Sequence, residues 1–219
     1  MTAKKSASKT SREQLIDRYM TDVLEKEAFP ASIYKFCKEH NFREEEFYAH
    51  FGSFDGLKRG IWSSFFQATT DLLDKNKEYE SFSNKDKLLT FYFSFFELLA
   101  LNRSYVLFSL SGKQSLLRNL HQLRGLRKRF KGFAGALIAD GNSGKSLKIT
   151  ERNPAVFSEA AWLQLLFLLR FWIEDVSPGF EKTDIAIEKS VQTAFDLFEN
   201  TPLDSILDFG KFLFKEHMA

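Results

Sequence analysis

The sequence predicts an all-α protein of roughly nine or ten helices. Three observations predict this fold class. Apolar residues recur at helical spacing and seldom alternate, helix-capping residues punctuate the chain, and only 4 Pro and 11 Gly interrupt its 219 residues. Because 44% of the residues are hydrophobic and 25 are Phe, the chain can bury a sizeable core.

The first expected helix follows a capping box, in which the Ser11 hydroxyl accepts from the backbone of Gln14 and the Gln14 side chain reaches back. Two short helices should come next, at about 32–39 and 44–51. Asn41 lies in the break between them, where asparagine tolerates a left-handed backbone. Two short helices joined by such a break are typical of a helix-turn-helix.

Further helices are expected along the rest of the chain. Asn153 should cap a long helix whose first turn holds Pro154, and Ser-Pro-Gly at 177–179 should end it. Another helix is expected over 113–139, followed by a polar, turn-rich loop at 140–153.

The helix-turn-helix stretch carries a family resemblance in its core and turn positions. These positions are Phe36, Cys37, Asn41, Phe42, Phe47, Tyr48, His50, Phe51 and Leu57. With the helix before it, the stretch resembles the TetR family of transcriptional regulators. The resemblance implies a three-helix DNA-binding head at 12–62, a helical ligand-binding and dimerisation body at 63–219, and a flexible basic arm at 1–11.

The same resemblance implies which positions of the head contact DNA. They are Ser32, Arg43, Glu44, Glu45, Glu46, Tyr48, His50 and Lys58. Lys4 and Lys5 of the basic arm are further candidates, because such an arm can enter a minor groove. The sequence departs from the family at the start of the second short helix, where three consecutive glutamates occur. It departs again at Phe54, where the family has a lysine that contacts phosphate.

The three glutamates can be interpreted in two ways. Carboxylates on a helix that enters the major groove are repelled by the phosphates, although a glutamate can accept from cytosine N4. Acidic residues in a first helical turn are also stabilised by the helix dipole, and this structural role is favoured. Likewise, the arm could enter a minor groove or serve only as a solubilising tail.

The body is rich in aromatic residues, and a helix over 91–99 is apolar nearly all round. The resemblance implies a ligand pocket among 86–175 and a dimer seam on 154–175 and 184–199. A solid aromatic core is the alternative to a pocket. A pocket with such a lining would take a small hydrophobic ligand such as a lipid, a quinone or a planar aromatic.

Candidate residues follow for both sites. The ligand candidates are Phe91, Phe95, Tyr105, Phe108, Phe133, Trp162 and Phe167. The homodimer candidates are Leu165, Leu169, Trp172, Ile187, Val191 and Phe195.

The overall charge does not identify a partner, because 31 Lys and Arg face 29 Asp and Glu for a formal charge of +2. The stretch 113–132 is the exception, since it holds basic residues and no acidic ones. It could meet an anionic membrane or an acidic partner, or form a solvated helix face that is paired with acids elsewhere.

No catalytic residue, metal site or cofactor is expected, so the chain is not interpreted as an enzyme. The glycine-rich stretch 141–146 lacks the first glycine and the strand of a P-loop, and the four His lack metal-ligand spacing. The N-terminal stretch lacks the apolar segment of a signal peptide. The apolar runs at 88–102 and 161–173 fall short of the roughly 20 residues that span a bilayer. A cytoplasmic protein is expected.

Two functions remain open. The first is a ligand-responsive transcriptional repressor of the TetR type that binds DNA as a homodimer. The second is a TetR-fold protein that binds a lipid- or quinone-like molecule and has lost DNA binding.

Overall fold

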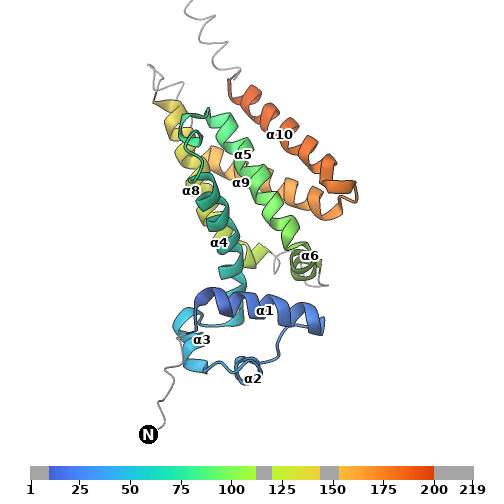
Figure 1. Cartoon of the computed structure of the whole chain (residues 1–219). Helices are drawn as coiled ribbons and strands as arrows, with labels where there is room; N and C mark the ends of the chain where they lie inside the picture. The colour runs from blue at the N-terminus through green and yellow to red at the C-terminus, as the bar shows by residue number, and fades with distance from the viewer. Residues whose placement is uncertain (1–9, 112–119, 144–152, 200–219) are drawn as a thin grey trace, which may run out of the picture. The chain divides into compact units, whose positions relative to one another are not determined.

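The computed structural model describes residues 10–111, 120–143 and 153–199 (Figure 1). Within these residues it contains nine α-helices, two short 3₁₀ turns and no strand. The expectation of an all-α chain of this helix number is confirmed. Lys4 and Lys5 of the arm and the last helix expected after Thr201 lie outside the described residues.

The chain divides into two compact units. The head unit is made of Met1–Gln67 and Leu98–Leu126, and the body unit is made of Ala68–Glu97 and Arg127–Ala219. The head unit holds α1 (Arg12–Lys26), α2 (Ile33–Glu39), α3 (Glu44–His50), the start of α4 (Phe54–Leu73) and α6 (Arg103–Ser111).

The head begins with the capping box that the sequence predicts. The Ser11 hydroxyl accepts from the Gln14 backbone, and the Gln14 side chain accepts from the backbone N–H of Ser11. The turn between α2 and α3 is also as predicted, since Asn41 has φ 57°. Both features position α3 relative to α1 by local backbone chemistry.

Aromatic rings build the core of the head. The Phe36 ring lies 6.1 Å from Tyr19, 6.3 Å from Phe47 and 5.8 Å from Phe54, centroid to centroid. Phe54 also packs 5.5 Å from Phe47 and 5.4 Å from Tyr19. The phenylalanine that departs from the family pattern is therefore part of the packing that holds α3 in place.

A buried polar chain links α4 to α6 within the head unit. The Trp62 indole N–H donates to the Gln122 side chain at 3.3 Å, and the Gln122 amide donates to the Ser109 carbonyl at 3.0 Å. Because every group in this chain is buried, these hydrogen bonds fix one arrangement of the three segments.

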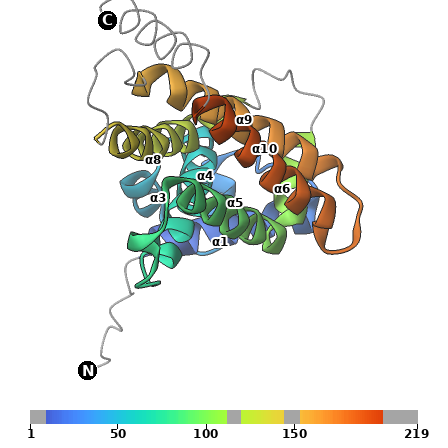
Figure 2. The same ribbon diagram turned by 90° about the horizontal axis from the view of Figure 1, so that it is seen from above.

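The body unit holds the end of α4 and most of α5 (Asn84–Leu101) and α8 (Arg124–Asn142). It also holds α9 (Pro154–Glu174), α10 (Glu181–Glu199) and the 3₁₀ turns at Tyr79–Ser81 and Pro178–Phe180. The antiparallel pair α9 and α10 lies side by side in both views (Figures 1 and 2). Asn153 caps α9 and Pro154 occupies its first turn, as the sequence predicts.

The expected helix over 113–139 differs from the structure. Residues 112–119 are outside the described part, a turn occurs at Leu123, and α8 starts at Arg124 and continues to Asn142, into the expected loop. The start of α8 lies against α4 at Gly125. A Cβ at this position would overlap Ser63 Oγ and lie 3.0 Å from the Arg59 carbonyl, so glycine permits the close approach.

Helix α9 is longer than the apolar run that predicts it. Its 21 residues are long and apolar enough to cross a membrane by length and composition alone, and it is the one such helix among the described residues. In the structure it buries Trp162, Leu165, Leu168, Leu169 and Trp172, as a core helix of a helical protein does.

Candidate functional site

The third helix of the head is oriented by two contacts to Thr10. The Thr10 hydroxyl donates to Glu46 Oε2 at 3.1 Å, and His50 Nε2 donates to the Thr10 carbonyl at 3.0 Å. Glu46 and His50 are four residues apart, so they lie on one face of α3. That face is directed into the head, and Thr10, near the end of the arm, is held against it by these two hydrogen bonds.

Glu46 has a second role as a helix cap. The backbone N–H of Arg43 donates to Glu46 Oε2 at 3.1 Å, which closes the N-terminus of α3. This backbone hydrogen bond, followed by those from Thr10 and the Arg43 side chain, lowers the pKa of the Glu46 carboxyl. Glu46 is therefore a structural carboxylate and not a group that faces a ligand of the head.

The outward face of α3 presents a different set of side chains. Arg43 and Glu45 are 70% and 85% exposed, and the guanidinium lies 3.5 Å from the Glu45 carboxylate. Tyr48 is also exposed. On α2, Tyr34 is exposed and lies under the Lys38 ammonium, 5.8 Å from it. The face therefore combines cations and aromatic rings with the exposed carboxylate of Glu45 and the partly exposed carboxylate of Glu44.

Two other predicted DNA contacts are engaged within the head. Ser32 caps α2, because its hydroxyl accepts from the Lys35 N–H at 3.2 Å. The Lys58 ammonium lies 4.3 Å from the centre of the Phe29 ring and 3.7 Å from Asp55 Oδ1, and its side chain is mostly buried. Both residues shape the head in this structure.

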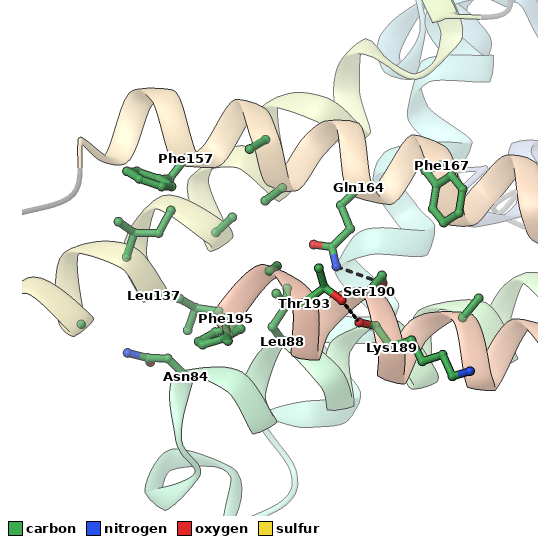
Figure 3. Close-up of a pocket in the computed structure, with 17 residues that line it drawn as sticks. Asn84, Leu88, Leu137, Phe157, Gln164, Phe167, Lys189, Ser190, Thr193 and Phe195 are labelled. Atoms are coloured by element: carbon green, nitrogen blue, oxygen red, sulfur yellow. Dashed lines mark hydrogen bonds between the residues drawn. The ribbon is translucent and has the colours of Figure 1, made fainter. Parts of the chain in front are cut away.

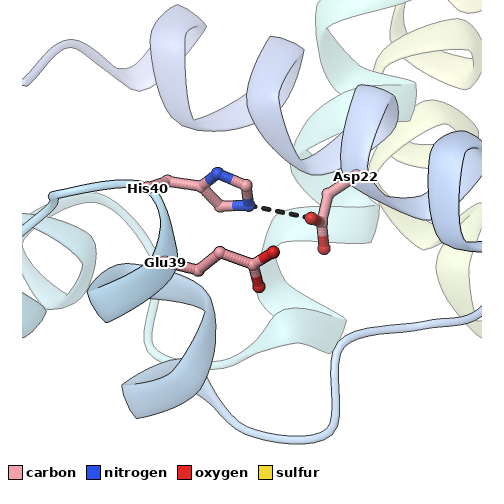
Figure 4. A group of neighbouring side chains, drawn as sticks. All are labelled: Asp22, Glu39 and His40. Atoms are coloured by element: carbon pink, nitrogen blue, oxygen red, sulfur yellow. Dashed lines mark hydrogen bonds and ion pairs between the residues drawn. The ribbon is translucent and has the colours of Figure 1, made fainter.

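A cluster of Asp22, Glu39 and His40 joins α1 to α2 and has the residue types of a metal site (Figure 4). His40 Nε2 lies 2.8 Å from Asp22 Oδ1, and Arg18 Nε donates to His40 Nδ1 at 2.9 Å. Because Nδ1 accepts from Arg18, the ring proton must be on Nε2, the atom that would ligate a metal.

A cation is already present in this cluster. The Lys26 ammonium lies 2.7 Å from Asp22 Oδ1 and pairs with Glu39, and the hydrogen bond to Asp22, followed by that to Glu39, raises the pKa of Lys26. The arrangement fits a structural ion-pair network that ties α2 to α1 and does not fit a metal centre.

The predicted ligand residues fall into three places. Phe91 and Phe95 are fully buried and stack at 5.6 Å, and Phe91 packs 4.8 Å from Phe133, so these three belong to a filled aromatic core. Trp162 is also buried in the body.

Tyr105 and Phe108 are on α6 in the head unit. Tyr105 lies 6.5 Å from Tyr19 and Phe108 lies 5.2 Å from Phe29, ring centre to ring centre. In the structure these two residues pack on α1 and on the segment after it.

A cavity of about 540 Å³ lies within the body unit, between α5, α8, α9 and α10. Phe167, on α9, is the one predicted ligand residue in its lining. Figure 3 shows Phe167 and Lys189 toward one end of the cavity and Asn84, Phe157 and Phe195 toward the other, with Gln164 between them.

Small side chains explain why this space is empty. Five alanines line it, at positions where larger apolar residues would meet: Ala134, Ala160, Ala161, Ala186 and Ala194. No local pattern in the sequence marks the cavity, because these alanines come from three helices that meet only in the fold. The cavity volume is within the range of ligand sites in proteins.

The predicted dimer residues lie mostly in the interior of the subunit. Leu165, Leu169, Trp172, Ile187 and Val191 are at most 3% exposed, because they form the contact between α9, α10 and α5. Phe195 lines the cavity. The apolar surface that α9 and α10 leave exposed consists of other residues, namely Val156, Leu163, Phe167 and Ile185.

The basic stretch on α8 is paired in part with an acid on α9. Arg127 Nη2 donates to both oxygens of Glu159, at 2.6 and 2.7 Å, and the Lys131 ammonium pairs with the same carboxylate. The hydrogen bonds from Lys131 and then Arg127 lower the pKa of Glu159. This pairing fits the interpretation of 113–132 as a solvated face better than a dedicated anionic-partner site, within the part that the structure describes.

A three-helix helix-turn-helix head and an all-α body with a ligand-sized cavity define a helix-turn-helix regulator. A family model, described as the tetracyclin repressor-like C-terminal domain, matches residues 87–213, more than half of the chain. The chain therefore belongs to the TetR family of transcriptional regulators. No curated protein matches it.

Proposed function

We propose that the protein is a ligand-responsive transcriptional repressor that binds DNA as a homodimer. One observation carries the proposal: Glu46 is withdrawn from the outward face of α3 by Thr10 and the Arg43 backbone. Glu46 of the acidic first turn therefore serves helix capping, while Arg43 and Tyr48 remain exposed on the outward face.

The charge of the outward face is compatible with a phosphate backbone. Lys35, Lys38 and Arg43 are exposed, and the Arg43 guanidinium lies 3.5 Å from the Glu45 carboxylate, which is 85% exposed. A guanidinium and a lysine ammonium can each neutralise a phosphate, and Glu45 can accept from the amino group of a cytosine.

A dimer and a ligand supply the remaining parts of the proposal. Two copies that meet through the exposed apolar residues of α9 and α10 would present two recognition helices to successive major grooves. A ligand could bind the body cavity more tightly in one conformation of the dimer than in another, where the two conformations differ in the spacing of the heads. Such a ligand would shift the population toward the conformation that it binds better and release DNA.

The test is a fluorescence-anisotropy titration of generic duplex DNA at low salt, repeated as salt rises. We expect a Kd of roughly 10⁻⁴–10⁻⁶ M or tighter, with log K falling linearly with log salt. Arg43→Ala should weaken binding and reduce the salt slope by about one. Glu45→Lys should strengthen non-specific binding, whereas the same charge change at Glu80, outside the head, should leave it unchanged.

A second candidate function is supported by the cavity together with the exposed acid at position 45. In this function the protein is a carrier or sensor of a hydrophobic molecule and does not bind DNA. It predicts no anisotropy change even at low salt, and a hydrophobic molecule that co-purifies with the protein in native mass spectrometry. Binding of duplex DNA that Arg43→Ala abolishes would exclude it.

A further inference from the structure

We propose that the body cavity binds a single-chain fatty-acyl carboxylate, with the hydrocarbon chain along α9 and the carboxylate beside Lys189. This inference rests on the proposed ligand site, not on DNA binding. It specifies a ligand class that follows from the shape, the hydrogen-bond inventory and the charge of the lining (Figure 3).

The shape favours an elongated ligand. The lining on α9 runs from Phe157 to Phe167, ten residues, which correspond to about 15 Å along a helix. Leu88 and Leu137 flank the space from α5 and α8. A space that extends this far along one helix accommodates one extended hydrocarbon chain.

The hydrogen-bonding groups of the lining are mostly engaged with one another. The Gln164 amide donates to Ser190 Oγ at 3.0 Å and its carbonyl accepts from the buried Tyr92 hydroxyl at 3.3 Å. The Ser190 hydroxyl donates to a backbone carbonyl, as does that of Thr193. If a ligand carried several polar groups along its length, those groups would find few hydrogen-bond partners in the lining. Burying them would cost several kcal/mol.

The second end of the cavity is apolar apart from Asn84 and the Gly141 backbone, among the described residues. Asn84 donates its amide to Asp140 at 2.9 Å, and Phe157 and Phe195 supply the remaining wall. The chain terminus of an amphiphile fits this end, so its head must lie toward the other.

The charge of the lining determines the head group. Among the described residues of the lining, Lys189 is the one ionisable residue and none carries a carboxylate. Lys189, Phe167 and Thr193 are exposed in the single subunit, so the ammonium lies at the surface end of the lining. An anionic head is attracted to the ammonium, whereas a cationic head is repelled.

The test is isothermal titration calorimetry on the full-length protein with octanoate, decanoate and laurate. Because each buried methylene contributes a similar transfer free energy, affinity should rise by up to about fourfold per methylene. Laurate should bind about threefold more tightly than dodecanol, and dodecyltrimethylammonium should bind more weakly than either. Equal binding of the cationic and anionic amphiphiles would overturn the assignment.

Two kinds of variant locate the ligand. Ala186→Leu should fill the cavity and abolish laurate binding, with Ala161→Leu as a second filling variant; circular dichroism checks that each is folded. Lys189→Gln should weaken the affinity for laurate by roughly threefold, since an exposed ion pair contributes little. The affinity for dodecanol, which has no charge, should not change. Lys182→Gln is the matched control on the same helix, because Lys182 does not line the cavity.

The outcomes separate this inference from the proposed function. DNA binding without laurate binding, or laurate binding that neither filling variant alters, would overturn the ligand assignment and leave the regulator intact. Laurate binding without DNA binding would support the ligand assignment and overturn the repressor.

Discussion

The hydroxyl of Thr10 donates to the carboxylate of Glu46 across 36 residues of sequence, at 3.1 Å. This hydrogen bond joins the base of the arm to the first turn of α3, and it separates Glu46 from the exposed Glu45 beside it. We expect Glu46→Ala to lower the melting temperature by a few degrees, because it removes both this bond and the N-terminal cap.

Two further variants distinguish capping from charge. Glu46→Gln keeps an acceptor at the capping position and should retain most of the stability, whereas Glu45→Ala should leave it within about 0.5 kcal/mol of the wild type. Differential scanning fluorimetry measures all three. Equal melting temperatures for Glu46→Ala and Glu45→Ala would contradict a structural role for Glu46.

The filled aromatic core predicts a large effect at Phe95. This ring is fully buried and packs against Phe91 and Phe96, so Phe95→Ala should cost about 3–5 kcal/mol of unfolding free energy. Phe167→Ala, at a residue that is 55% exposed, should cost about 1 kcal/mol or less. Urea denaturation compares them, and similar costs would mean that Phe95 borders a space and not a packed core.

Local chemistry made several helix starts and one turn predictable from sequence. The capping box at Ser11, the left-handed Asn41 and the Asn153–Pro154 start of α9 each depend on a few neighbouring residues, and each is found as predicted. Whether Phe91 lines a core or a cavity depends on which helices meet it. No local pattern contains that information, and the alanines that create the cavity come from three helices.

The same distinction applies to surfaces. Leu165 and Leu163 lie on the same apolar helix, and the sequence alone does not tell which face of α9 meets α10 and α5. The structure buries Leu165 completely and leaves Leu163 64% exposed. Glu46 is a third case, because its partner Thr10 is remote in sequence and the glutamate run by itself does not show which carboxylate is directed inward.

Alanine substitutions at Gly125 and Gly132, both on α8, should change the stability of the protein in opposite directions. Gly→Ala in a helix usually stabilises it by up to about 1 kcal/mol, and Gly132→Ala on the same helix should do so, because open space surrounds that position. Gly125→Ala should destabilise by about 1–3 kcal/mol, since its Cβ would overlap Ser63 Oγ.

A double-mutant cycle tests the cause of that effect. Removal of the hydroxyl in Ser63→Ala should recover part of the loss in the double variant, with a coupling of about 0.5–3 kcal/mol. Chemical denaturation of the four proteins gives the coupling. Strict additivity would show that the cost at Gly125 comes from the Arg59 carbonyl or from the backbone and not from Ser63.

Leu163 tests the surface through which we propose that two copies meet. A carboxylate in the centre of an apolar interface is desolvated without a partner, so Leu163→Glu should convert a dimer into a monomer. Leu101→Glu, at an 84% exposed leucine outside α9 and α10, is the control and should leave the dimer intact. Light scattering coupled to size-exclusion chromatography reads out the mass, and a dimeric Leu163→Glu protein would place the interface elsewhere.

Asp175 predicts how the stability of the α9–α10 turn depends on pH. Burial opposes its ionisation, but hydrogen bonds from the side chains and backbone of Ser177 and Thr183 outweigh burial and hold its pKa at about 2, below the ordinary 3.8. Since the folded state has the lower pKa, this carboxylate stabilises the fold above about pH 4, and the contribution is lost as the pH falls toward 2.

Asp175→Asn should therefore be less stable than the wild type at neutral pH and should lose less stability between pH 4 and pH 2. Urea midpoints across that interval measure the slope, with Glu174→Gln as an exposed neighbouring control; equal slopes for Asp175→Asn and the wild type would remove Asp175 as the cause.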